Sequence, residues 1–167
     1  EVDTLSLHDA LPIFTSFLMS LINARAALEE VIEDSLRDKH PRLTVIFDNA
    51  PLTGTAPNEE DVLVSIDFDQ STLQPLGDAV TFYEGNVSCV ISIPFDQGTK
   101  KATQIAETLI TGLTDINKSS YVDKYSVVPK VREIEGPTSV RDDDEQRLPR
   151  AVRCVFTANS KMYKAFS

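Results

Sequence analysis

Apolar positions along the chain switch between a helical and an extended spacing, and the order of these segments predicts the fold. Two segments repeat apolar residues with the period of an amphipathic helix, and they span 20–38 and 99–114. Five segments alternate apolar and polar residues or contain short apolar runs, as strands do: 43–47, 62–68, 79–95, 121–135 and 148–157. We therefore expect an α+β domain in the order α-β-β-β-α-β-β, with two helices packed on one face of a mixed or antiparallel sheet.

The ends of both predicted helices carry boundary signals. Ser20 and Thr99 are residue types that commonly cap helix N-termini. The first helix should end at His40, because Pro41 disfavours helical backbone at the residue before it. The residues that recur at helical spacing, and that we expect to face the core, are Leu21, Ala24, Leu28, Val31, Ile32, Ser35, Leu36, Ala102, Ile105, Ala106, Leu109, Ile110 and Leu113.

The segment 79–95 has a glycine, Gly85, inside a long extended pattern. A glycine at such a place indicates a bulge or a close approach of two backbones. Two interpretations compete, one long bent strand or a tight hairpin that turns at Gly85 and Asn86. We favour the bent strand, because the residues before Glu84 make only a short strand of their own. Residues 70–78 and 136–147 are predicted loops.

The first part of the chain does not continue the pattern that follows it. Residues 1–14, EVDTLSLHDALPIF, resemble translated sequencing-adapter read-through, and Met19 begins a stretch that looks like a natural start. We predict a non-native extension at 1–18, one domain at 19–158 and a C-terminal tail at 159–167. No Lys or Arg precedes Arg25, so we expect no secretory signal and an intracellular product.

Composition narrows the possible functions. The chain has 167 residues, which fits one domain, and a formal net charge of -10. An acidic chain does not bind nucleic acid through a basic footprint. Two cysteines are too few for a disulfide framework, and no apolar run reaches the length of a membrane span.

A search for chemistry finds few candidates. His40 is the one histidine outside residues 1–18, and we expect it to be solvated at the helix end. Cys89 and Cys154 fall on the inward side of their strands, so we expect core packing. Asp67 and Asp69 could pair as carboxylates, but nothing nearby in the sequence would orient a substrate. We therefore predict no catalytic, cofactor-binding or metal-binding residues, and no enzyme activity.

The order of small motifs in the middle of the chain resembles a known family. The motif begins with an aromatic residue and a glycine, Tyr83 and Gly85, and continues with spaced apolar residues at Val87, Val90 and Ile91. It ends with Pro94 and Phe95, a turn at Gly98 and a helix that starts at Thr99. The C-terminal stretch RDDDEQRLPRAVRCVF is also similar to the end of the lambda tail terminator. Over roughly residues 19–158, the chain thus resembles the bacteriophage tail-terminator, or tail-completion, proteins.

This resemblance implies a structural virion protein. Such proteins form a homo-hexameric ring that caps the tail tube, stops its polymerisation and joins the tube to the neck or head connector. The implied location is the tail and neck of the virion, after assembly in the host bacterial cytoplasm. Genomic DNA would pass the lumen without specific binding, and neither a cofactor nor a membrane is implied. The alternatives are another neck, head-completion or tail-completion subunit, a small cytosolic enzyme using Asp67 and Asp69, or an unrelated interaction domain.

The acidic run Asp142, Asp143, Asp144 and Glu145 is our candidate for a loop that faces the lumen or the tube. A contiguous run lacks the alternating ligand spacing of calcium loops, so we interpret it as a solvated surface that repels DNA. Reversing these charges to lysine should leave folding intact, as judged by circular dichroism, while changing ring assembly or tail length. Unchanged assembly and tail length would contradict the assignment.

Overall fold

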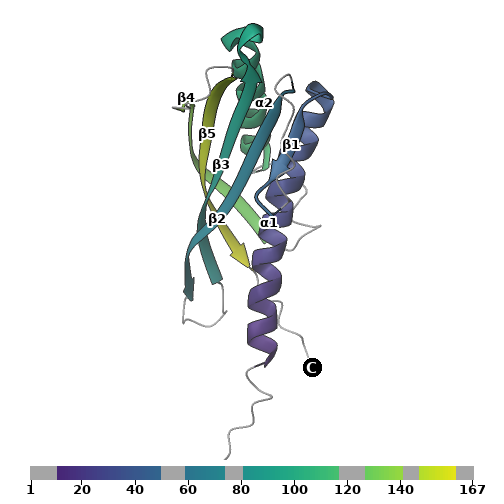
Figure 1. The fold of residues 1–167 in the computed structure, drawn as a ribbon. Helices are drawn as coiled ribbons and strands as arrows, with labels where there is room; N and C mark the ends of the chain where they lie inside the picture. Colours follow the sequence, from purple (N-terminus) through teal and green to yellow (C-terminus); the bar gives the residue numbers. More distant parts are fainter. Residues whose placement is uncertain (1–10, 50–58, 74–80, 117–126, 141–146, 161–167) are drawn as a thin grey trace, which may run out of the picture.

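The computed structural model describes residues 11–49, 59–73, 81–116, 127–140 and 147–160. Within them the elements follow the predicted order (Figure 1). They are α1 (Leu11–Lys39), β1 (Thr44–Phe47), β2 (Asp61–Leu73), β3 (Thr81–Pro94), the short 3-10 helix η1 (Phe95–Gln97), α2 (Gly98–Asp115), β4 (Val127–Ser139) and β5 (Arg147–Ser160). The α+β class and the α-β-β-β-α-β-β order are confirmed.

The five strands form one mixed sheet in the order β1-β2-β3-β5-β4. β1 runs parallel to β2, and each of the other neighbouring pairs is antiparallel. Both helices lie on the same side of this sheet, as predicted (Figure 1). The opposite side, which we call the open face, is covered by neither helix.

The core lies between the helices and the covered face of the sheet. Strand alternation places Val64, Cys89 and Phe156 on this face, each fully buried. The helix stripes meet them with Leu28, Ile32 and Leu36 from α1 and Ile105, Leu109 and Leu113 from α2. Burying one such aliphatic or aromatic side chain contributes roughly 1.5–3 kcal/mol, so the shared apolar face dominates the stability of the fold.

Gly112 allows α2 to approach α1 closely. A methyl group at this position would collide with the side chain of Ser35 on α1. The Ser35 hydroxyl is itself held by a hydrogen bond that it donates to the carbonyl of Val31, 2.6 Å away. The two helices therefore touch through small residues at this point.

The segment around Gly85 is one strand, so the bent-strand interpretation is confirmed and the hairpin is excluded. Gly85 is buried, opposite Phe68 on one side and Phe156 on the other. A Cβ atom there would meet the carbonyl oxygen of Asp67 and lie 2.7 Å from the Phe156 ring. The rings of Phe68 and Phe156 pack edge to face, 5.5 Å between centroids, beside the missing side chain. The bulge itself lies in β2, where Asp69 is an extra residue between Phe68 and Gln70.

Two predicted helix caps are wrong. The first helix begins at Leu11, so Ser20 lies inside it. The stretch 11–22 contains no glycine, and Pro12 lies in the first turn, where its missing N–H costs nothing. The N-cap of α2 is Gln97, not Thr99, and it makes no side-chain capping bond. The turn into α2 depends instead on Gly98, whose φ of +72° suits glycine.

The two predicted loops, 70–78 and 136–147, were both too long. β2 continues through 70–73, because the backbone pairs there with residues 81–84 of β3. β4 continues from Pro129 through Gly136 to Ser139, with bulges on the way, and β5 begins at Arg147. Pro129 is compatible with this strand because β4 is an edge strand, where a missing backbone donor is tolerated.

Gly85→Ala should lower the free energy of unfolding by about 3 kcal/mol, because the added methyl group meets backbone and a packed ring. Gly98→Ala is the matched control, since the space around it is open and only the positive φ is strained. We expect a loss of about 1 kcal/mol for that control. Equal losses in chemical denaturation would contradict the close packing at Gly85.

Candidate interfaces on the open face and edges of the sheet

The open face carries polar and charged side chains from the central strands and β4. In register across the sheet, Ser88 of β3 lies beside Arg153 of β5, and Arg153 lies beside Glu135 of β4. A hollow of about 480 Å³ forms there, lined by Asn86, Val87, Ser88, Glu133, Glu135, Arg153 and Val155. Val155 is a large apolar residue that is 39% exposed. The depression therefore combines two carboxylates, one guanidinium group and an exposed valine.

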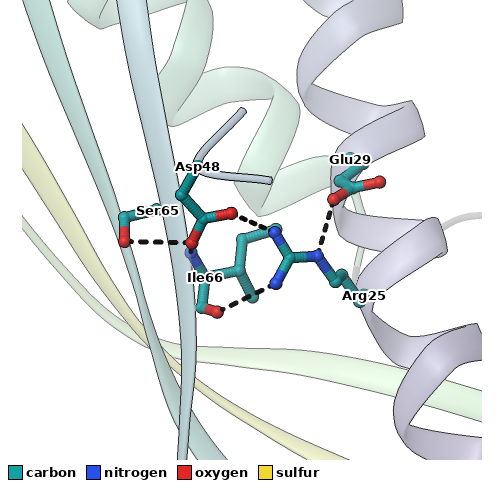
Figure 2. A network of polar contacts seen from close by, with 5 residues as sticks. All are labelled: Arg25, Glu29, Asp48, Ser65 and Ile66. Atoms are coloured by element: carbon teal, nitrogen blue, oxygen red, sulfur yellow. Dashed lines mark hydrogen bonds and ion pairs between the residues drawn. The ribbon is translucent and has the colours of Figure 1, made fainter. Parts of the chain in front are cut away.

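The β1 edge of the sheet holds a polar cluster that joins α1 to β2 (Figure 2). Arg25 of α1 donates to Glu29, 2.7 Å away, and pairs with the carboxylate of Asp48, just after β1. Asp48 in turn accepts from the hydroxyl of Ser65 and from the backbone N–H of Ile66, both at 3.3 Å. A longer contact of 3.5 Å runs from Arg25 to the Ile66 carbonyl.

This cluster replaces the strand partner that β2 loses when β1 ends. β1 pairs with β2 only as far as Phe47 and Val64, so the next outward-facing backbone groups belong to Ile66. The Asp48 carboxylate takes the place of a strand carbonyl, and Arg25 approaches the Ile66 carbonyl. A buried backbone donor or acceptor left without a partner would be costly, so these side chains stabilise the end of the parallel pair.

The same contacts shift both ionisable groups toward their charged forms. Burial alone would raise the pKa of Asp48, but hydrogen bonds from Arg25 and the Ile66 N–H lower it by more. Burial would lower the pKa of Arg25, but hydrogen bonds to Glu29 and Asp48 raise it overall. The cluster is therefore a charged, structural link between a helix and the sheet edge.

A second polar cluster lies where β5 begins and links three strands of the sheet. Arg147 donates to the Ser92 hydroxyl at 2.6 Å and to the Glu59 carbonyl at 2.8 Å. It also pairs with Asp61 at 2.6 Å, with both side chains only 11% exposed. The guanidinium thus ties β5 to β3 and β2. Sequence reasoning missed Arg147 and Asp61, because 86 positions separate them.

His40 is not the solvated residue that the sequence suggested. It is partly buried between the helices, with Nε2 3.1 Å from the Thr108 hydroxyl of α2. Burial and the nearby charge of Lys101 lower its pKa. Its position at the end of α1 places it against α2, and this makes it an interhelical contact.

Cys89 and Cys154 are buried free thiols, which confirms the prediction of core packing. They lie diagonally on β3 and β5, since Val87 is the register partner of Cys154. Burial raises the pKa of each thiol to about 12, so neither is activated as a nucleophile.

The two carboxylates that the sequence singled out, Asp67 and Asp69, lie on the solvent-exposed surface of β2. The Asn86 side-chain amide donates to Asp69. Neither carboxylate lines the hollow of the open face. Asp142, Asp143, Asp144 and Glu145 lie outside the described residues. Within the described ranges, no three histidine, cysteine or carboxylate side chains form a group that could hold a metal ion.

Comparisons with known proteins show a similarity of fold and do not indicate a function. No family model and no curated protein matches the chain. Among solved structures, 27 chains match. One of them, whose name states no function, has a TM-score of 0.58 and 20% sequence identity over 86% of this chain and 96% of its own. At that identity the likeness extends to the fold alone. No described helix is long and apolar enough to cross a membrane.

Asp48→Asn should lower the free energy of unfolding by about 1 kcal/mol at neutral pH, because Arg25 loses a charged partner. The folded-state pKa of Asp48 lies below its unfolded value, so its contribution is present above the unfolded pKa. It is lost as the pH falls through the folded-state pKa. The difference between variant and wild type should therefore shrink toward acidic pH in denaturation curves.

The matched control for this prediction is Glu33→Gln. Glu33 pairs with Arg37 on the exposed side of α1, where an ion pair contributes little. This variant should unfold almost as the wild type does throughout the pH range. A constant difference between Asp48→Asn and the wild type at every pH would count against the edge cluster.

Proposed function

We propose that this chain is a structural virion protein of a tailed bacteriophage, a tail terminator whose copies form a ring on the tail tube. The supporting observation concerns the residues that carry the family resemblance. Three of them have a definite role in the backbone from β3 to α2. Gly85 admits the Phe156 ring, Pro94 ends β3, and Gly98 turns the chain into α2. The motif therefore corresponds to one continuous strand-turn-helix segment of the fold.

A ring subunit needs two different surfaces that meet head to tail. The sheet offers such surfaces, because its two outer strands differ in length and in direction relative to their neighbours. β1 is a short strand parallel to its neighbour, whereas β4 is long and antiparallel to its neighbour. The open face adds a third surface, with its hollow and exposed Val155, for the tail tube or the neck connector.

The polar clusters of the described residues have structural explanations, which favours a mechanical role. Arg25 and Asp48 complete a sheet edge, Arg147 and Asp61 join three strands, and His40 links the helices. The alternative enzyme would use Asp67 and Asp69, which are exposed and lie outside the hollow. A different neck, head-completion or tail-completion subunit would share the same physical features, and its position in the virion would distinguish it.

The purified protein should form a ring, with the mass of six 18.5 kDa chains by light scattering and a central opening by negative-stain microscopy. Added tail tubes should carry the ring at one end and stop growing. A stable monomer in the presence of tubes would contradict the proposal. So would turnover of a small molecule that disappears in Asp67→Asn or Asp69→Asn.

A further inference from the structure

His40 lies at a corner where four parts of the chain meet. Its backbone N–H donates to the Leu36 carbonyl at 2.7 Å, and its own carbonyl accepts from the N–H of Leu43 at 3.0 Å. The chain then enters β1, where the Thr44 N–H donates to the carbonyl of Glu60 at 3.0 Å. The end of α1, the start of β1 and the residue before β2 are thus joined, and the partly buried imidazole contacts α2.

The hydrogen bonds at Thr108 assign the proton of the neutral imidazole. The Thr108 hydroxyl has one proton, which it donates to the Gln104 carbonyl at 3.0 Å, as other threonines of α2 do in the turn before them. The same hydroxyl oxygen lies 3.1 Å from Nε2 of His40, so Nε2 must carry a proton and donate it. Only this assignment makes both contacts hydrogen bonds. The neutral imidazole is therefore the Nε2–H form, and a second proton has to enter at Nδ1.

That second proton would create a cation beside other cations. Lys39 is the last residue of α1, and Lys101 lies on α2 about two turns before Thr108. Glu60 offsets these charges, but it already forms an ion pair with Lys101 at 3.2 Å. Burial and the two lysines lower the pKa of His40 and outweigh the opposite effect of Glu60.

The packing of the helices beside His40 limits how a charged imidazole can gain water. Ser35 meets Gly112 about one turn away from the contact between His40 and Thr108, and a methyl group at Gly112 would already collide with Ser35. The two helices therefore run in opposite directions and touch closely at this point. Fuller hydration of a charged imidazole requires the end of α1 to move away from α2.

We propose that His40 is an acid-sensitive link between α1 and α2, neutral in its Nε2–H form at neutral pH and released from α2 when Nδ1 takes up a proton. Nε2 keeps its proton in the cation, so the charge and its need for water drive the release. This inference goes beyond the proposed ring and does not depend on it, because it concerns the packing within each subunit.

The sign of the pH effect follows from the lowered pKa of His40. The unfolded chain takes up a proton at this residue near the ordinary value of 6.5, before the folded chain does. The stabilisation by neutral His40 is therefore complete above that value, and it is lost as the pH falls through the folded-state pKa.

Nitrogen-15 NMR of the imidazole tests the assignment in the wild-type chain, with the His40 signals identified by their absence from His40→Gln. Near neutral pH, Nε2 should be protonated and Nδ1 should not, and the pKa should lie below its ordinary value. Lys101→Met should raise this pKa, because it removes a cation and frees Glu60. Lys100→Met, an equal charge change at an exposed position, should leave the pKa nearly unchanged. An Nδ1–H form, or a pKa that Lys101→Met does not raise, would overturn the link.

His40→Gln tests the release, since glutamine keeps an N–H donor for Thr108 and cannot become a cation. Between about pH 7.5 and about pH 5.5, the urea midpoint of the wild type should fall relative to that of this variant. At the lower pH, amides in the last turn of α1 should exchange faster in the wild type. Lys101→Met provides the same test should His40→Gln not fold, and its midpoint should fall less than that of the wild type. Midpoint differences that do not change with pH, or equal amide exchange, would overturn the proposal and leave the proposed ring untouched.

Discussion

The structure depends on the burial of one face of its sheet beneath two helices. Alternate residues of β2, β3 and β5 supply an apolar layer, and the stripes of α1 and α2 close over it. Because the helices cover one face only, the other alternate positions become a polar open face. The same arrangement leaves the outer strands as boundaries that must be completed by other groups.

The outer strands and the start of β5 are completed in different ways. At β1 the Asp48 carboxylate stands in for a strand carbonyl, and Arg25 binds it to α1. Where β5 begins, the little-exposed pair of Arg147 and Asp61 holds three strands together. β4 instead carries Pro129, two bulges and several charges, which are features that limit uncontrolled pairing of strands. A sheet built in this way favours selective contacts through side chains.

These features favour a protein that works by assembly. The two cysteines are buried with a raised pKa, and His40 is occupied between the helices. The surfaces that remain are a mixed-charge hollow and two chemically different sheet edges. The tail terminator that we propose needs surfaces of this kind, one pair for its own copies and another for the tube or connector.

The sequence by itself determined the class of the fold, the order of elements and the inward faces of the strands. These follow from local periodicity, which is set by the geometry of helix and strand and needs no knowledge of distant partners. The sequence also indicated that Gly85 marks either a bulge or a close approach of two backbones. In the folded chain Gly85 is a site of close approach, and the bulge lies beside it in β2.

Only the tertiary structure decided the strand order, the true ends of β2 and β4, and the start of α2. Residues 70–73 and 136–139 look like loops locally, but they form strands because neighbouring strands supply their hydrogen bonds. The same holds for the partners of Asp48, Arg147 and His40, which lie far away in the chain. Cooperative contacts between distant residues have no local signature, and for that reason the sheet edges and their charges appeared only once the chain was folded.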